Sequence, residues 1–124
     1  MKEILLSLSL SLILTLAVEL ALALILGVRR GKDLFIIALA NILTNPAVNY
    51  CAYWAFRLFT THSIYTVLII ILLEISAVFA EFIIYRRLLS YERVGKLKLS
   101  LLLNAASFLT GIVISAFMTL FAAL

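Results

Sequence analysis

Four long runs of apolar residues take up nearly the whole chain of 124 residues. They extend from about Ile4 to Val28, Leu34 to Phe56, Ile64 to Tyr85, and Leu99 to the C-terminus. A transmembrane helix needs about 20 predominantly apolar residues, and each run is long enough. The sequence therefore predicts an all-α, polytopic membrane protein with four transmembrane helices in a single domain, residues 1–124.

The composition supports this interpretation, because 66% of the residues are hydrophobic and only 13% are charged. Soluble domains contain about 45 to 50% apolar and about 25% charged residues. The net charge of +4 does not indicate a nucleic-acid partner, since the basic residues lie beside the ends of apolar runs, where they orient membrane proteins. We therefore expect the lipid bilayer as the main partner and no nucleic acid.

The distribution of basic residues predicts the orientation. Loops 29–33 and 86–98 contain eight of the ten Lys and Arg residues, whereas Lys2 and Arg57 lie on the other side. Cytoplasmic loops carry an excess of Lys and Arg. We therefore expect a multi-pass protein of the plasma (inner) membrane with both rich loops in the cytoplasm and both termini outside. A dual-topology protein, such as a small multidrug-resistance transporter, would lack this asymmetry.

The two halves of the chain share a pattern of polar residues. Each half reads as Glu on one helix, a basic turn containing Gly-Lys, and Asn-x-x-Thr or Asn-x-x-Ser on the returning helix; the matched pairs are Glu19 and Glu81, Asn41 and Asn104, and Thr44 and Ser107. This pattern predicts two tandem helical hairpins, about residues 1–62 and 63–124. Because both hairpins would enter the membrane from the same side, we expect a pseudo-twofold axis along the membrane normal.

Polar residues recur at helical spacing within every predicted span, so each span has a polar stripe. The stripes comprise Ser7, Ser11, Thr15 and Glu19 in the first span; Asn41, Thr44, Asn45 and Asn49 in the second; Glu74 and Glu81 in the third; and Asn104, Ser107, Gly111 and Ser115 in the fourth. Lipid cannot satisfy these groups, so the stripes should converge inside the protein. The small residues Ser107, Gly111 and Ser115 also predict a face for close helix packing.

Pro46 lies within the second span, directly after Asn45. Proline removes a backbone donor and crowds the carbonyl of Ile42, four residues earlier, so we expect a helix kink. Such kinks occur at transport sites and also in ordinary membrane helices.

Glu19, Glu74 and Glu81 each cost about 2.5 to 3.5 kcal/mol to place near the centre of a spanning helix. An acid in hydrocarbon must be neutral and hydrogen-bonded, face water or hold a cation. Together with Asn41, Asn45, Asn104, Thr44 and Ser107, these acids form a candidate site for a hard cation or a proton. A zinc site is not expected, because the lone His62 lies in an outer loop and the lone Cys51 has no partner.

Two broad functions follow from these residues. The first is a small channel or transporter subunit that binds or passes a cation or proton through the Glu/Asn cluster, with no further cofactor. The alternative is a non-transporting assembly or structural subunit, packed against partner helices or its own copies in a homo-oligomer. An intramembrane enzyme is less favoured, since no predicted span contains histidine and no serine or cysteine is placed beside a base.

The run Asn41-Ile42-Leu43-Thr44-Asn45-Pro46 carries a resemblance when it is taken with the acids around it. With Glu19 upstream and Glu74, Glu81, Asn104 and Ser107 downstream, the chain resembles a group of small uncharacterised prokaryotic four-span membrane proteins. The likeness covers most of the chain. It implies a functional polar core and attaches no activity to it.

Overall fold

The computed structural model describes residues 2–59 and 63–122, and these residues form four helices and no strand. The helices are α1 (Lys2–Ile25), α2 (Gly31–Leu58), α3 (Ile64–Leu88) and α4 (Lys96–Ala122). Each is long and apolar enough to cross a membrane, so the predicted fold class, a multi-pass all-α membrane protein, is confirmed. His62 lies outside the described residues.

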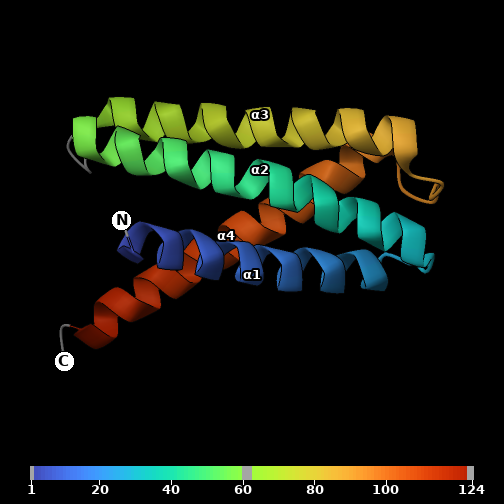
Figure 1. Ribbon diagram of the computed structural model, residues 1–124, viewed down its shortest axis with the longest axis horizontal. Coiled ribbons are helices and arrows are strands. Elements are labelled where there is room, and N and C mark those ends of the chain that lie inside the picture. The colour runs from blue at the N-terminus through green and yellow to red at the C-terminus, as the bar shows by residue number, and fades with distance from the viewer. Residues whose placement is uncertain (1, 60–62, 123–124) are drawn as a thin grey trace.

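The helices alternate in direction and form a ring in which each packs against two neighbours, α1 with α2 and α4, and α3 with α2 and α4. Figure 1 shows α1 and α3 running one way and α2 and α4 the other, with α4 crossing the bundle obliquely. We call the end that holds the α1–α2 and α3–α4 connections the basic end. The opposite end, from which α1 starts and at which α4 finishes, is the terminal end.

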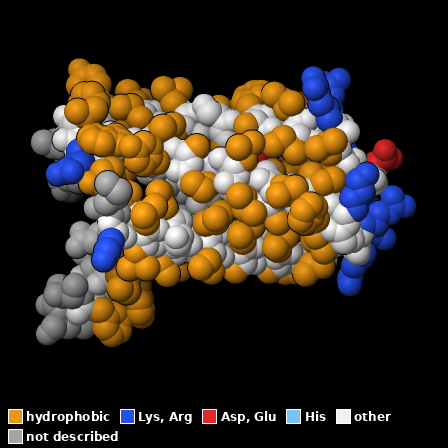
Figure 2. Space-filling model, in the orientation of Figure 1, with side chains coloured by type: hydrophobic (Ala, Val, Ile, Leu, Met, Phe, Trp, Pro, Cys, Tyr) orange, Lys and Arg blue, Asp and Glu red, His pale blue; other side chains and the backbone are white. Residues whose placement is uncertain are grey.

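The surface matches a bilayer along the sides and water at the ends. Exposed apolar side chains occur on all four helices. Figure 2 shows these side chains along the flanks and Lys and Arg gathered at the basic end. An apolar flank between charged ends is the distribution that a membrane-spanning bundle requires.

The most tightly packed part of the molecule lies at the basic end. Ten buried residues form one apolar cluster, which we call the basic-end core: Ala23, Val28, Ile36, Ile37, Ala40, Tyr85, Leu89, Tyr91, Leu99 and Leu103. They come from the last turns of α1 and α3, the first turns of α2 and α4, and the connections between them. This core closes the space between the helices at the basic end.

The α1–α2 connection is a tight turn built around Gly27, whose φ is +95°. The Val28 amide donates to the Ala23 carbonyl at 2.9 Å, and the Gly27 amide donates to the Leu24 carbonyl at 3.0 Å. This is the Schellman arrangement, which ends a helix with a left-handed residue, usually glycine. The turn places Val28 back in the basic-end core.

The two connections at the basic end bind one another. The Tyr91 hydroxyl donates to the Leu26 carbonyl at 2.6 Å, and the Ser90 amide donates to the buried Asp33 carboxylate at 2.9 Å. The Lys96 ammonium donates to the carbonyls of Leu89 and Tyr91. The Lys96 contacts lie within the α3–α4 connection, whereas the Tyr91 and Ser90 contacts, which we call the basic-end clamp, hold this connection against the α1–α2 connection and the start of α2.

The structure refines two expectations from the sequence. Helix α2 runs without interruption through Pro46, so the proline does not end it, and a kink there stays a prediction. The segment between α3 and α4 is non-helical from Leu89 to Gly95, and α4 begins at Lys96, three residues before the expected start of the fourth apolar run.

Candidate functional site

Glu19 of α1 lies in the middle of the bundle and is 1% exposed. Both of its carboxylate oxygens accept a hydrogen bond from another helix. Asn41 Nδ2 of α2 donates to Oε2 at 2.7 Å, and Ser107 Oγ of α4 donates to Oε1 at 2.9 Å. The acid therefore joins three helices through neutral donors.

Glu81 of α3 is 0% exposed and has a corresponding set of partners. Thr44 Oγ1 of α2 donates to Oε1 at 2.8 Å, and Asn104 Nδ2 of α4 donates to Oε2. The Tyr85 hydroxyl, one turn along α3, donates to the same Oε2 at 3.3 Å. Glu81 therefore also joins three helices.

Helices α2 and α4 each supply one donor to Glu19 and one donor to Glu81. On α2, Asn41 binds Glu19 and Thr44, three residues later, binds Glu81. On α4, the order is exchanged, so that Asn104 binds Glu81 while Ser107 binds Glu19. Each acid thus takes an amide from the helix that follows it in the chain and a hydroxyl from the helix of the other half.

The donors are held in place by their own helices. Asn41 Nδ2 also donates to the Ile37 carbonyl at 3.1 Å, and the Ala40 carbonyl, 3.0 Å from Thr44 Oγ1, is a second acceptor for the one hydroxyl proton of Thr44. On α4, Asn104 Nδ2 donates to the Ser100 carbonyl at 3.0 Å. Bonds to the carbonyl four residues earlier fix the side chains against the helix, and this orients their donors toward the acids.

A second layer of polar contacts lies nearer the terminal end, between α1 and α2. Asn45 Nδ2 donates to Thr15 Oγ1 at 2.8 Å, and Ser11 Oγ lies 3.4 Å from Asn45 Oδ1. Asn49 Nδ2 donates to the Asn45 carbonyl at 2.9 Å. The stripes of the first two spans therefore face each other over several turns.

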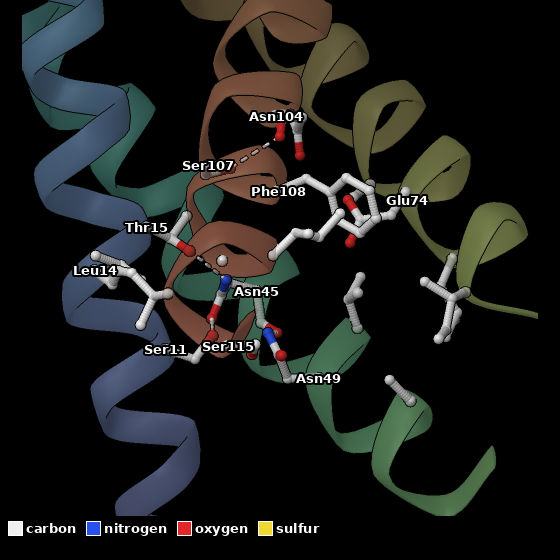
Figure 3. Close-up of a pocket in the computed structure, with 18 of the residues that line it drawn as sticks. Ser11, Leu14, Thr15, Asn45, Asn49, Glu74, Asn104, Ser107, Phe108 and Ser115 are labelled. Atoms are coloured by element: carbon white, nitrogen blue, oxygen red, sulfur yellow. Dashed lines mark hydrogen bonds between the residues drawn. The ribbon is translucent and has the colours of Figure 1, made fainter. Parts of the chain in front are cut away.

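A cavity of about 840 Å³ extends from these contacts toward the terminal end. Its lining includes Glu19 and Asn104 at the inner end and Ser7, Phe56 and Thr119 at the outer end. Figure 3 shows Asn45, Asn49 and Glu74 around this space, and Figure 2 shows the surface divided into two lobes at the terminal end. Among the described residues, no Lys, Arg or His lines the cavity.

Glu74 of α3 differs from the two buried acids. It is only partly buried and lines the cavity, and no hydrogen bond or ion pair joins it to another residue in the described part of the chain. Among the described residues of the cavity wall, Glu74 is therefore an acid without a hydrogen-bonding or ionic partner.

The structure brings most of the predicted site residues together. Glu19, Glu81, Asn41, Thr44, Asn104 and Ser107 form one hydrogen-bonded cluster, while Asn45 lies in the second layer and Glu74 on the cavity wall. However, within residues 2–59 and 63–122 no group of three or more acidic, His or Cys side chains could hold a metal ion. Glu19, Glu74 and Glu81 therefore do not form a three-carboxylate cage.

The predicted packing face on α4 has two parts. Ser107 contacts Glu19, but nothing lies within 4 Å of a Cβ built on Gly111, and Ser115 is exposed and lines the cavity. No other helix of the described chain packs closely on Gly111. A close contact there with a second chain stays a prediction.

Sequence reasoning missed Tyr85, which it treated only as the end of the third span. Tyr85 is fully buried and donates to Glu81 four residues earlier. The spacing of four was available in the sequence, since residues four apart share a helix face.

Comparison of the chain with protein-family models, with curated proteins and with solved structures gave no match.

Proposed function

We propose that this chain is a small membrane transporter or channel subunit that binds or passes a proton or cation through the cavity. Glu74 receives the cation first, and Glu19 and Glu81 form the inner part of the path. Asn41, Asn45 and Asn104, with Thr44 and Ser107, position or accompany the acids. We also propose the plasma membrane as its location, with the basic end in the cytoplasm.

One observation carries this proposal: a cavity that no described basic side chain lines reaches the buried Glu19, and its wall includes Asn104, which is bonded to the buried Glu81. The acids are held by amides and hydroxyls, which are neutral donors. Within residues 2–59 and 63–122, no Lys or Arg is bonded to either acid. A cation or proton that enters the cavity meets carboxyl oxygens whose charge the protein has not already neutralised.

Simple adhesion between helices is a weaker explanation of the acids. Polar contacts between membrane helices contribute about 0.6 kcal/mol on average. Inserting an acidic residue costs about 2.5 to 3.5 kcal/mol, so serine or glycine would join the helices at lower cost. In the described part of the chain, no hydrogen bond or ion pair offsets the cost of Glu74.

The exchanged donors support the pseudo-twofold relation between the two hairpins. An axis along the membrane normal that superimposes Glu19 on Glu81 would also superimpose Asn41 on Asn104 and Thr44 on Ser107. The hydrogen bonds follow this exchange, and α1 and α3 run in parallel (Figure 1). We propose that duplication of one hairpin produced a site on the axis, as in transporters with parallel repeats.

The cavity extends toward the terminal end, and no residue of the basic-end core lines it, which bears on the mode of transport. The basic-end core and the basic-end clamp close the other side. A solute could cross only if this part opened. The arrangement therefore corresponds to one state of a gated channel or of an alternating-access transporter.

Flux measurements test the proposed function. Purified protein in liposomes should carry H⁺ or a monovalent cation down an imposed gradient, and Glu19→Gln and Glu81→Gln should reduce the rate by about tenfold or more. Glu92→Gln is the matched control, because Glu92 is exposed in the α3–α4 connection and does not line the cavity. Absence of flux under every gradient would remove the proposal, as would equal loss in the control.

The last turns of α4 favour the second candidate, a subunit of an assembly. Nearly every described side chain from Ile112 to Phe121 is exposed, so this segment contacts little of its own chain. Its polar Ser115 and Thr119 lie among the exposed positions. A homo-oligomer or a partner membrane subunit would cover them, and the mass of the protein in a lipid nanodisc would reveal it.

A further inference from the structure

A second cavity of about 390 Å³ lies between α3 and α4, and we call it the α3–α4 groove. Most of its wall is apolar and exposed, including Ile75, Phe79 and Leu101. Because α3 and α4 are long and apolar enough to span a membrane, exposed side chains halfway along them face hydrocarbon. The groove therefore opens toward lipid, whereas the larger cavity opens at the terminal end.

The groove and the larger cavity are adjacent. Three residues line both spaces, namely Glu74, Asn104 and Phe108. Figure 3 shows Glu74 and Phe108 on the part of the cavity wall formed by α3 and α4. An unpartnered acid and an aromatic ring thus lie at the boundary between a polar space and a lipid-facing one.

We propose that this boundary binds an amphipathic cation, with the positively charged head group at Glu74 in the cavity and the apolar tail in the α3–α4 groove. The proposal rests on the proposed function, because it uses the same cavity and the same acid. It adds the class of the ligand and the side from which the ligand enters, the bilayer.

Charge and polarity select this ligand. The groove offers the tail apolar walls, and the only polar groups at the boundary are Glu74 and Asn104. Neither space is lined by a described Lys, Arg or His, so the positive partner of Glu74 has to come from the ligand. Phe108 also offers an aromatic face, which attracts quaternary ammonium groups.

The apolar tail also favours entry from lipid over entry from water. A tail that moves from lipid into the groove keeps apolar neighbours, so it loses no hydrophobic free energy. A tail in the larger cavity would contact the polar side chains of Ser11, Asn45 and Asn49 as well as apolar ones, so it would gain less there than in the groove. The apparent affinity, calculated from the aqueous ligand concentration, should therefore be higher for a ligand with a tail than for one without. This advantage should disappear when the groove is filled.

Ligand binding to protein in phosphatidylcholine nanodiscs tests this proposal. The probes are radiolabelled dodecyltrimethylammonium and its tail-less counterpart tetramethylammonium, with binding to empty nanodiscs subtracted. The variants are Ala105→Trp, which fills the groove, and Ala21→Trp, its matched control. Both alanines are exposed, but only Ala105 lines the groove, and Ala21 lines neither space.

We expect the dodecyl probe to bind at least about tenfold more tightly than tetramethylammonium. Ala105→Trp should remove that advantage while leaving tetramethylammonium binding unchanged, which also shows that the variant is folded. Ala21→Trp should change neither, and Glu74→Gln should weaken both probes.

Two results would overturn the inference, and they differ in what they imply for the proposed function. If tetramethylammonium binds as tightly as the dodecyl probe and depends on Glu74, the groove has no part in binding, but the cation cavity stands. If neither probe binds above empty nanodiscs, the inference and the cation form of the proposed function fail together.

Discussion

At the scale of single residues, the central feature is that Glu19 and Glu81 are held by four small side chains that also contact their own helices, with the Tyr85 hydroxyl as a further donor to Glu81. These donors reach both oxygens of each carboxyl group, and none of them is a basic residue among those that the structure describes. Removing Asn41 leaves Glu19 Oε2 without a donor, and removing Asn104 leaves Glu81 Oε2 with only the 3.3 Å bond from Tyr85. A buried polar group that loses its donor is costly where water cannot replace it.

Asn41→Ala and Asn104→Ala should therefore destabilise the protein by similar amounts, about 1 kcal/mol each and seldom above 2. The similarity follows from their matching roles toward Glu19 and Glu81. Unfolding in mixed dodecyl maltoside and SDS micelles, followed by circular dichroism, measures the free energy. Asn49→Ala is the control, because Asn49 donates only to a carbonyl of its own helix. A loss as large in Asn49→Ala would contradict this account.

The residues of this cluster could largely be predicted from the sequence, because residues four apart share a helix face and acids within apolar spans are expected to face the protein interior. The pairing of particular oxygens and donors could not. It depends on the rotation and tilt of each helix, which the pattern of polar residues leaves open. Tyr85 was missed for a related reason, since an aromatic residue near a span end also suits the membrane interface.

At the scale of helices and turns, the Schellman turn at Gly27 matters because it positions residues of two features. Val28 packs in the basic-end core, and the Leu26 carbonyl accepts the Tyr91 hydrogen bond of the basic-end clamp. Gly27 has a positive φ, and a Cβ at this position would lie 3.0 Å from Arg93 Nη1. Among the four glycines, only Gly27 has a left-handed backbone and a side chain within 4 Å of a Cβ built at its position, whereas Gly31, Gly95 and Gly111 face open space. Sequence alone predicted a basic loop here without predicting the geometry of the turn.

Gly27→Ala should destabilise the protein by about 1 to 2 kcal/mol, the cost of a side chain in the left-handed conformation. Gly111→Ala is the matched control. Gly111 lies in a helix with open space around it, so alanine there should leave stability unchanged or raise it by up to about 1 kcal/mol. Thermal unfolding in one detergent gives both values. Equal effects of the two substitutions would show that the positive φ of Gly27 does not make alanine costly there.

At the scale of the whole molecule, the two ends differ in charge and in packing. The basic end is closed by an apolar core and covered by Lys and Arg, and the terminal end carries the mouth of the cavity. The number of spans and the basic loops were predictable from composition and spacing. The one-sided cavity was not, because it results from the oblique path of α4 away from the other helices (Figure 1).

The proposed orientation predicts how the ends react with a membrane-impermeant maleimide. In a Cys51→Ser background, Lys2→Cys should be labelled in intact cells, and Arg30→Cys should be labelled only after the membrane is opened. Both residues are exposed, so access to the reagent depends on the side of the membrane. Labelling of each cysteine from both sides would indicate dual topology instead of the orientation expected from the basic loops.

The closed basic end gives the sharpest test of transport through this molecule. The Ser90 amide is bonded to Asp33 in the first turn of α2, and Arg30 is the residue directly before that helix. Arg30 and Ser90 are both exposed, so cysteines at these positions can be joined by a short bifunctional maleimide in the Cys51→Ser background. If the basic-end clamp must open during transport, the cross-link should abolish flux while cation binding from the terminal end is retained. Each single-cysteine variant treated with the same reagent controls for modification alone. Full flux through completely cross-linked protein would mean that the solute does not pass between the two hairpin turns, and the path would have to be sought elsewhere, for example between copies of the chain.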